Sequence, residues 1–165
     1  MNANNFEIEK KYLIEYPDIE YLKSISEYTE IEQIYLKSDL GVSERIRKRG
    51  KDGNYLYYHT IKIPITDMTR IEEEKLISLS EYEEFKKRAD DRFNIIYKTR
   101  YCIDHGGHVI EVDVFPFWSK QAFAEIELSS EDEEFSLPDY IRIIRDVTED
   151  GRYTNHALAH EIPRE

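Results

Sequence analysis

Cysteine is almost absent from this chain. Cys102 is the single one among 165 residues, which excludes an intrachain disulfide and a cysteine-based zinc site. The sequence also lacks any run of about 18 apolar residues, the length that a membrane-spanning helix needs. Its first residues carry no basic leader followed by an apolar stretch, so no secretory signal is predicted. These absences predict a cytoplasmic protein with no membrane partner, in which Cys102 is an ordinary reduced thiol.

Basic residues are the minority among the charged ones. Lysine and arginine number 23 against 35 aspartates and glutamates, which gives a formal net charge of −12. This balance argues against a nucleic-acid partner bound through a broad basic surface. Glycine and proline are scarce, at 6 and 5 residues, whereas aromatic residues make up 13% of the chain. Linkers and disordered proteins rarely have that composition, so we expect a single folded domain over residues 1–165.

Alternation of apolar and polar residues is the dominant pattern, and it predicts strands. Asp52-Gly53 and Gly106-Gly107 have the composition of hairpin tips, which favours antiparallel neighbours. The strands are expected near residues 5–15, 30–38, 43–50, 54–65, 69–78, 93–104, 107–115, 123–129 and 143–148.

Three helical segments are predicted between and after the strands. One covers residues 18–28, directly after Pro17. A second covers residues 80–90, because Ser80-Glu81-Tyr82-Glu83 has the pattern of a capping box. A short C-terminal helix is expected after Thr154.

Most of the strands carry charged residues at alternate positions, so these side chains share one face of each strand. The opposite face is apolar, as in Ile61, Ile63 and Ile65. The charges on the shared face are Glu7, Glu9, Lys11, Arg45, Arg47, Arg49, Lys62, Arg70, Glu72, Glu74, Lys98, Arg100, Glu111, Asp113, Glu125 and Glu127.

Two arrangements satisfy this alternation. In one, the helices cover the apolar face and about eight antiparallel strands close into a barrel whose charged interior holds one small ligand. In the other, an open sheet exposes its charged face to water and packs its core on the apolar side. Alternation alone leaves both open, although enclosing so many ions without a bound partner would be costly.

The presence of both signs of charge indicates a chemistry for the closed arrangement. Arginine and lysine side chains suit phosphate oxygens. Carboxylates at alternate strand positions suit a hard divalent cation such as Mg²⁺ or Mn²⁺. A polyphosphate bridged to carboxylates through such a metal accounts for both sets at once. The local field rather than the net charge decides whether an anion binds.

At this level of detail the sequence resembles the CYTH, or triphosphate tunnel metalloenzyme, superfamily. The resemblance implies a mainly β fold, an eight-stranded antiparallel closed β-barrel forming a charged tunnel, with a few helices packed outside and a short C-terminal helix. The matching motifs, in chain order, are Glu7-Ile8-Glu9-Lys10-Lys11, Arg45-Ile46-Arg47, Lys62, Arg70-x-Glu72-x-Glu74, Lys98-Thr99-Arg100, Glu111-Val112-Asp113, Glu125-Ile126-Glu127 and the segment 153–159.

The resemblance also implies roles for these residues. The expected metal ligands are Glu7, Glu9, Glu125 and Glu127. The expected phosphate-binding residues are Lys11, Arg45, Arg47, Lys62, Lys98 and Arg100, together with Arg70, for which an ion pair with the glutamates is favoured slightly over phosphate. The expected catalytic group consists of Lys11, Glu72 and Glu74, with the proton acceptor left open between Lys11 and a lumen glutamate. Further acidic residues of the lumen are Glu111 and Asp113.

The reaction that the resemblance implies is metal-assisted attack of water on a terminal phosphorus, with inorganic tripolyphosphate as the simplest substrate. A class IV adenylate cyclase, which would use the same tunnel to make cyclic AMP from ATP, is the alternative. Thiamine and nucleoside triphosphates are further candidate substrates, and a non-catalytic polyphosphate-binding module is a further class. Apolar barrel surface left uncovered by the helices would make a homodimer reasonable.

Two other features are assigned ordinary structural roles. His156 and His160 lie four residues apart on the last predicted helix, and without a third ligand of suitable spacing they are interpreted as surface histidines. Trp118 is predicted to anchor a crossover onto the outer apolar face. The direction in which Gln33 and Tyr35 point is not fixed by the pattern.

Overall fold

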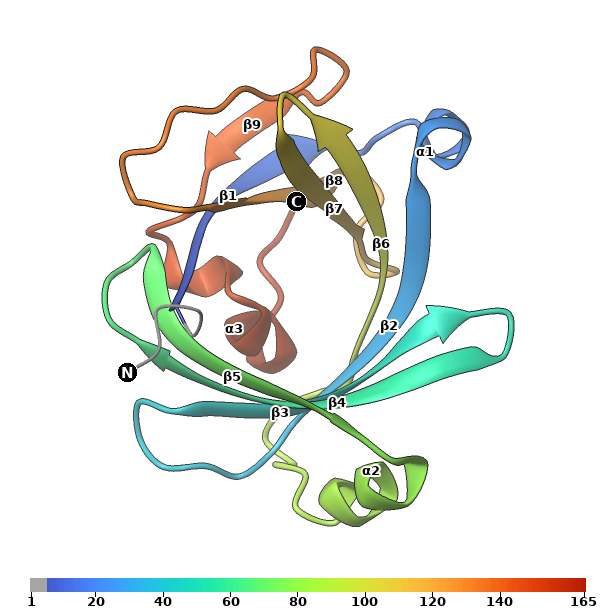
Figure 1. Ribbon diagram of the computed structural model, residues 1–165, viewed down its shortest axis with the longest axis vertical. Helices are drawn as coiled ribbons and strands as arrows, with labels where there is room; N and C mark the ends of the chain where they lie inside the picture. The colour runs from blue at the N-terminus through green and yellow to red at the C-terminus, as the bar shows by residue number, and fades with distance from the viewer. Residues whose placement is uncertain (1–5) are drawn as a thin grey trace.

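The computed structural model describes residues 6–165, and its strands form a closed ring seen end-on in Figure 1. The strand order is β5-β4-β3-β2-β6-β7-β8-β1, all neighbours are antiparallel, and β5 pairs back onto β1. The eight strands are β1 (Phe6–Glu15), β2 (Glu27–Tyr35), β3 (Ser43–Lys51), β4 (Asn54–Pro64), β5 (Thr69–Ile77), β6 (Ile96–His105), β7 (His108–Val114) and β8 (Gln121–Leu128). The predicted closed eight-stranded antiparallel barrel is confirmed; residue 5, the predicted start of the first strand, lies outside the described residues.

The ring closes along only part of β1. The first residues of β1 pair with β5, with Glu7 opposite Arg70. Further along, the same edge of β1 pairs with a ninth strand, β9 (Ile143–Asp146), with Tyr12 opposite Asp146. The barrel wall is therefore completed by β5 near the start of β1 and by the C-terminal segment near its end.

The predicted hairpin tips are confirmed at β3–β4 and β6–β7. Asp52 and Gly53 both have positive φ, at 54° and 80°, and so do Gly106 and Gly107, at 58° and 83°. Two successive residues with positive φ give the tight turn whose twist matches antiparallel strands, and glycine adopts this conformation without steric cost.

The main hydrophobic core lies outside the barrel. Ile14, Ile110 and Ile126 are fully buried on the outer faces of β1, β7 and β8. Helix α1 (Ile19–Ile25), capped by the Asp18 side chain, packs on this surface through Leu22. It ends before the predicted residue 28, because residues 27–35 form β2.

Helix α2 (Leu79–Lys86) covers the outer face of β3 and β4 with Tyr82. Its capping box is formed by Ser78, which accepts a hydrogen bond from the Glu81 backbone N–H while the Glu81 side chain accepts one from the Ser78 backbone N–H. The prediction that Ser80 is the cap is therefore wrong by two residues. The same serine-x-x-glutamate spacing fits both positions, so the sequence pattern alone does not distinguish them.

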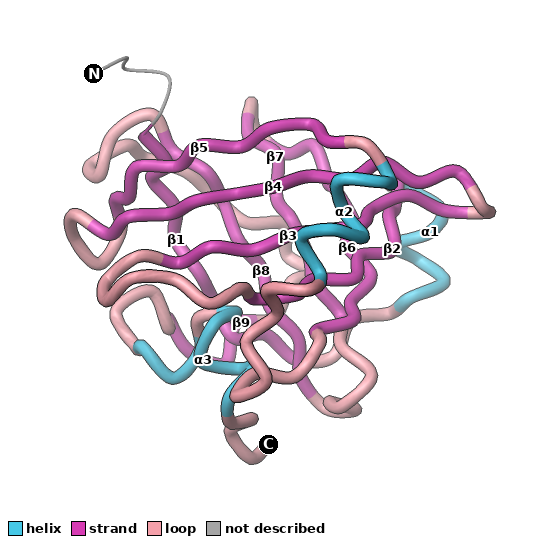
Figure 2. Tube along the Cα trace, turned by 90° about the horizontal axis from the view of Figure 1, so that it is seen from below, coloured by secondary structure: helices cyan, strands magenta, loops and turns pink. Residues whose placement is uncertain are grey.

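The C-terminal segment closes one end of the barrel. After a 3₁₀ turn, η2 (Gly151–Tyr153), helix α3 (Asn155–His160) lies within the opening of the ring in Figure 1, and Figure 2 shows α3 and the C-terminus at one end of the molecule. Leu158 packs with inward-facing residues of the strands, among them Phe115 and Phe123. No helix in residues 6–165 is long and apolar enough to cross a membrane.

Trp118 belongs to this inner cluster. Its ring lies 5.1 Å from that of Phe123, an inward residue of β8, and 5.6 Å from that of Phe115, which directly follows β7. The prediction that Trp118 packs on the outer apolar face is therefore wrong. At this end the interior of the barrel is apolar, so the segment that connects β7 to β8 can fold inward.

Candidate active site

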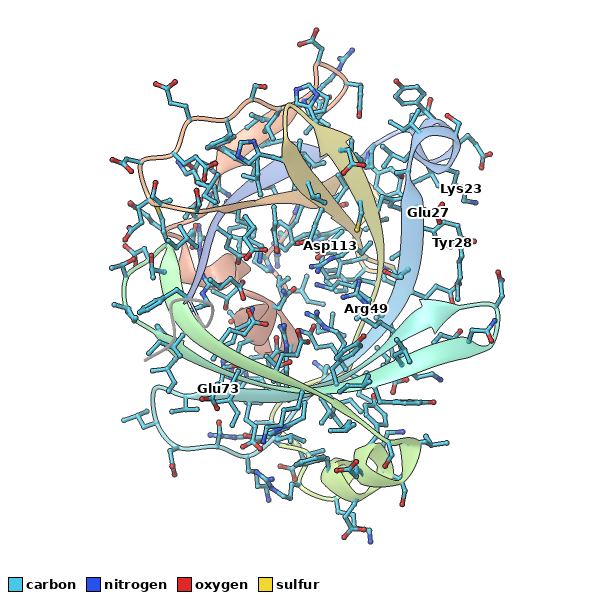
Figure 3. All side chains as sticks on the ribbon, viewed as in Figure 1. Lys23, Glu27, Tyr28, Arg49, Glu73 and Asp113 are labelled. Atoms are coloured by element: carbon cyan, nitrogen blue, oxygen red, sulfur yellow. The ribbon has the colours of Figure 1, made fainter. Side chains whose placement is uncertain are left out.

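A cavity of about 560 Å³ occupies the remainder of the barrel interior. Figure 3 shows Arg49 and Asp113 within the ring of strands. Among the predicted site residues, the cavity is lined by Glu7, Glu9, Lys11, Arg45, Arg47, Lys62, Arg70, Glu72, Glu74, Arg100, Glu111, Glu125 and Glu127. Lys98 and Asp113 do not line it; both side chains are fully buried behind Arg100.

Three carboxylates gather where β1 and β8 meet. Glu9 and Glu127 are directly opposite each other in the strand register, and Glu7 is the next inward residue of β1. Burial raises the pKa of Glu127, and the negative charges of Glu7 and Glu9 raise it further. The three side chains therefore form a spot of excess negative charge that a cation would relieve.

Two cations lie beside these carboxylates. Lys62 Nζ is 3.2 Å from Glu7 Oε1, and Arg70 Nη1 donates a hydrogen bond of 2.8 Å to Glu9 Oε1. Burial alone would raise the pKa of Glu7, but the charge of Lys62, a hydrogen bond with Glu9 and the charge of Arg70 together outweigh it, and the net pKa lies below the ordinary value. Burial and the charge of Arg45 lower the pKa of Lys62 to about 8. Arg70 thus has the ion-pair geometry that was favoured for it.

Glu125 has a different environment from the other three expected metal ligands. Its carboxylate lies 3.2 Å from Lys11 Nζ and 3.8 Å from Arg100 Nη2. Lys11 Nζ also lies 4.3 Å from the centroid of the Phe123 ring, at the boundary with the inner apolar cluster. The pair of Lys11 and Glu125 therefore sits at the end of the cavity that the cluster closes.

A buried ionic network joins β6 and β7. Asp113 accepts hydrogen bonds of 2.7 Å from Lys98 Nζ and of 2.7 and 2.9 Å from the Arg100 guanidinium. Burial would raise the pKa of Asp113, but these two cations hold it well below the ordinary value. Arg100 also contacts Glu111, whose pKa is raised by burial. Asp113 therefore serves to hold the two cations in place.

The inward arginines of β3 differ from all the other cations of the lumen. Within residues 6–165, Lys11, Lys62, Arg70, Lys98 and Arg100 each have a carboxylate within 4.0 Å. None is recorded for the three β3 arginines, which are Arg45, Arg47 and Arg49. This row of arginines is a strip of uncompensated positive charge.

The first two arginines of the row are nearly completely buried. Arg47 donates hydrogen bonds of 3.0 and 2.8 Å to Gln33 Oε1, and Gln33 in turn donates one of 2.6 Å to the Tyr35 hydroxyl. Burial and the charges of Arg45 and Arg100 lower the pKa of Arg47 to about 9. The Nε of Arg45 is buried with no hydrogen-bond partner in the described residues. A buried donor left unpaired is costly, so the site favours an acceptor such as a phosphate oxygen.

The sequence pattern missed three contributors to this site. Gln33 and Tyr35 point inward and orient Arg47, although their direction was left open. Arg49 also lines the cavity, although it was not among the expected phosphate-binding residues. The two-residue period of β3 places Arg49 on the same face as Arg45 and Arg47, so alternation alone carried that signal.

The unpaired arginines and the crowded carboxylates lie on opposite walls. In the ring order, β3 is separated from β8 by four steps in either direction. Glu125 and Glu127 on β8 therefore face the row of Arg45, Arg47 and Arg49 across the cavity. A ligand that carries negative charge along its length and a metal ion on one side would complement both walls.

The carboxylates fit a hard divalent metal by donor chemistry. Within residues 6–165, no three His, Cys, Asp or Glu side chains already converge as the ligands of one ion. The adjacent carboxylates Glu7, Glu9 and Glu127 nevertheless offer the oxygen donors that Mg²⁺ or Mn²⁺ prefers, and their mutual repulsion favours a cation. Mg²⁺ usually takes one or two carboxylates and fills its other positions with water and substrate phosphates.

A closed antiparallel barrel whose lumen has arginines on one wall and carboxylates on the other is the arrangement expected for a triphosphate tunnel protein. The chain belongs to the CYTH, or triphosphate tunnel metalloenzyme, superfamily. It is 33% identical over 163 residues to the inorganic triphosphatase of Nitrosomonas europaea, covering 95% of this chain and 99% of the relative. No family model matches the sequence.

Solved structures show the same fold. The inorganic triphosphatase NE1496 superposes with a TM-score of 0.60 at 31% identity, over 96% of this chain and 97% of that one. HpAC1 from Hippeastrum, an adenylyl cyclase candidate described as having a dominant triphosphatase activity, gives a TM-score of 0.52 at 12% identity, over 74% of this chain and 80% of that one. The second likeness concerns the fold alone.

Proposed function

We propose that this protein is a divalent-metal-dependent triphosphatase that hydrolyses inorganic tripolyphosphate inside the barrel. The observation that carries the proposal is the opposition of the two walls, with the unpaired arginines of β3 on one side and the carboxylates of β1 and β8 on the other. The relative of known activity, matched along 95% of this chain, is an inorganic triphosphatase.

Glu7, Glu9 and Glu127 would hold the metal ion, with Glu125 as the fourth expected ligand at the inner end. Mg²⁺ or Mn²⁺ bound there would polarise a phosphoryl oxygen and neutralise developing charge. Lys62 and Arg70 lie within 4.0 Å of these glutamates, so they can contact a phosphate that approaches the carboxylates.

The remaining residues of the chain bind and orient the phosphates and the attacking water. Arg45 and Arg47 present their guanidinium groups to the phosphate oxygens, and Gln33 fixes the orientation of Arg47. Glu74 accepts a hydrogen bond of 3.2 Å from the Thr60 hydroxyl, and Glu72 lies 3.9 Å from Lys62 Nζ. These two glutamates therefore keep acceptor capacity to orient a water and take its proton, whereas Lys11 is paired with Glu125.

The lining of the cavity favours an inorganic substrate over a nucleotide or thiamine triphosphate. Among the described residues that line it, only Tyr35 and His156 carry an aromatic ring. Their rings lie 4.9 Å apart, and the Tyr35 hydroxyl accepts a hydrogen bond from Gln33, so both are already engaged. A base or thiamine ring would find charged rather than aromatic partners, which disfavours the cyclase alternative.

The test compares substrates and then removes single carboxylates. The purified protein with Mg²⁺ or Mn²⁺ should release phosphate from tripolyphosphate faster than from ATP or thiamine triphosphate, without forming cyclic AMP. Glu9→Gln and Glu127→Gln should each lower metal-dependent turnover at least about 100-fold, since even outer-shell changes cost 10- to 100-fold. Glu73→Gln, on the exposed outer face of β5, is the matched control.

Three outcomes would contradict the proposal. Unchanged turnover in Glu9→Gln and Glu127→Gln would refute the metal assignment. Cyclic AMP as the main product would establish the cyclase, and tight tripolyphosphate binding without any product would establish the binding module. We also propose a cytoplasmic location and a homodimer. Exposed apolar residues outside the barrel, such as Ile63 and Ile65, support the homodimer.

A further inference from the structure

The third arginine of the β3 row has no carboxylate partner among the described residues of the lumen. Arg49 is the next inward residue after Arg47, lies opposite Ile31 of β2 and lines the cavity. Its recorded contact is a long hydrogen bond of 3.5 Å from Nη2 to the Thr29 hydroxyl. The Arg49 side chain is partly buried. No carboxylate in residues 6–165 lies within 4.0 Å of it, so its positive charge is uncompensated.

The neighbouring cations of the same strand are engaged differently. Lys51 Nζ lies 3.5 Å from a Glu27 carboxylate oxygen, and Lys48 Nζ lies 4.4 Å from the centroid of the Tyr55 ring on the outer face. These two lysines therefore have ordinary partners. A partly buried guanidinium without a counter-ion destabilises the folded protein, and a bound anion would offset that free-energy cost.

The position of Arg49 along the lumen indicates which anion it would meet. Arg45 lies opposite Tyr35 of β2, whose ring lies 4.9 Å from that of His156 on α3, so this arginine is near the closed end. Arg49 lies four residues further along β3, about 13 Å away from Arg45 at the usual rise per residue. The row of arginines therefore runs from the closed end of the cavity toward the opposite end.

We propose that Arg49 binds an additional phosphate group, and that the lumen is built for linear polyphosphates longer than tripolyphosphate, with tetrapolyphosphate as the simplest example. The inference rests on the proposed function for the placement of the first phosphates at Arg45 and Arg47. A phosphate chain held by those two arginines and extended along β3 is directed toward the guanidinium of Arg49. Thr29 accepts its long hydrogen bond, and Ile31 and Leu56 lie opposite it in the register of the neighbouring strands.

The test measures affinity and turnover for both chain lengths. Tripolyphosphate and tetrapolyphosphate are titrated calorimetrically into wild-type protein, Arg49→Gln and Arg49→Lys in EDTA, and kcat/KM is then measured with Mg²⁺. Arg49→Gln should weaken tetrapolyphosphate binding about tenfold, the size expected for one charge-assisted hydrogen bond, and tripolyphosphate binding less than about twofold. Arg49→Lys should keep part of the difference. Lys48→Gln removes the same charge from the outer face and is the matched control.

The outcomes separate this inference from the proposed function. Equal weakening of both ligands by Arg49→Gln, or no weakening of either, would overturn the role of Arg49 in chain length. If the wild-type protein releases no phosphate from either substrate, the proposed hydrolysis fails. The affinity difference between the two chain lengths in EDTA would still decide the binding role of Arg49.

Discussion

The ionic network around Asp113 makes the strongest prediction about stability. Lys98 and Asp113 side chains are completely buried, and Asp113 accepts three hydrogen bonds from Lys98 and Arg100. Asp113→Asn keeps the shape but removes the charge, so Lys98 is left buried without a counter-ion. Breaking a buried ion pair in this way costs about 3–5 kcal/mol. For a chain of this length each kcal/mol lowers Tm by about 2–4 °C, so Tm should fall by roughly 6–20 °C.

Urea denaturation and thermal unfolding of the two proteins in phosphate-free buffer would measure this loss. Asp104→Asn, on an exposed position of β6, removes the same charge and should change stability by less than about 0.5 kcal/mol. If Asp113→Asn does not fold, the double variant with Lys98→Met should, because Arg100 keeps Glu111 as a partner. A loss below about 1 kcal/mol in the single variant would refute the reasoning that Asp113 compensates two buried cations.

Two further predictions concern α3 and α2. Burial lowers the pKa of His156 below 6.5, so the unfolded chain binds more protons below pH 6.5 and stability is lost as pH falls from there through the lower folded pKa. His156→Asn should reduce the fall in Tm between pH 7.5 and 5.5, and an undiminished fall would exclude His156 as its source. Ser78→Ala should cost about 1 kcal/mol in urea denaturation, because it removes the N-cap of α2. Ser80→Ala, inside the helix, should cost far less, and equal losses would contradict the observed capping box.

The barrel was predictable because alternation continued through strands far apart in the sequence. A single strand such as residues 7–11 fits an outward charged face as well as an inward one. The recurrence of charged pairs at Arg45 and Arg47, and again at Glu125 and Glu127, resembles one family over nearly the whole chain, and the closed ring confirms the resemblance. The same alternation placed Arg49 inward, but the family pattern did not include it.

The missed features depend on contacts that alternation does not encode. The inward residue Asp113 of β7 is followed two positions later by Phe115, directly after the strand, and that change of polarity marks the start of the inner apolar cluster. The pattern of residues 111–115 could have signalled an apolar end to the lumen. The cap of α2 was misplaced for a different reason, since Ser78 and Ser80 are each followed three residues later by a glutamate and the pattern does not distinguish them.

Because much of the interior of this barrel is charged, apolar packing on its outer faces contributes much of its stability. The outer faces of β1, β7 and β8 carry the largest buried cluster, including Ile14 and Ile126. The outer faces of β4 and β5 are covered less well, and Ile63 on the outer face of β4 is 42% exposed. The carboxylates of β1 and β8 thus lie on the well-packed side, which would give the proposed metal ion a rigid frame. The β3 arginines lie on the side that α2 covers, where the buried outer cluster is smaller.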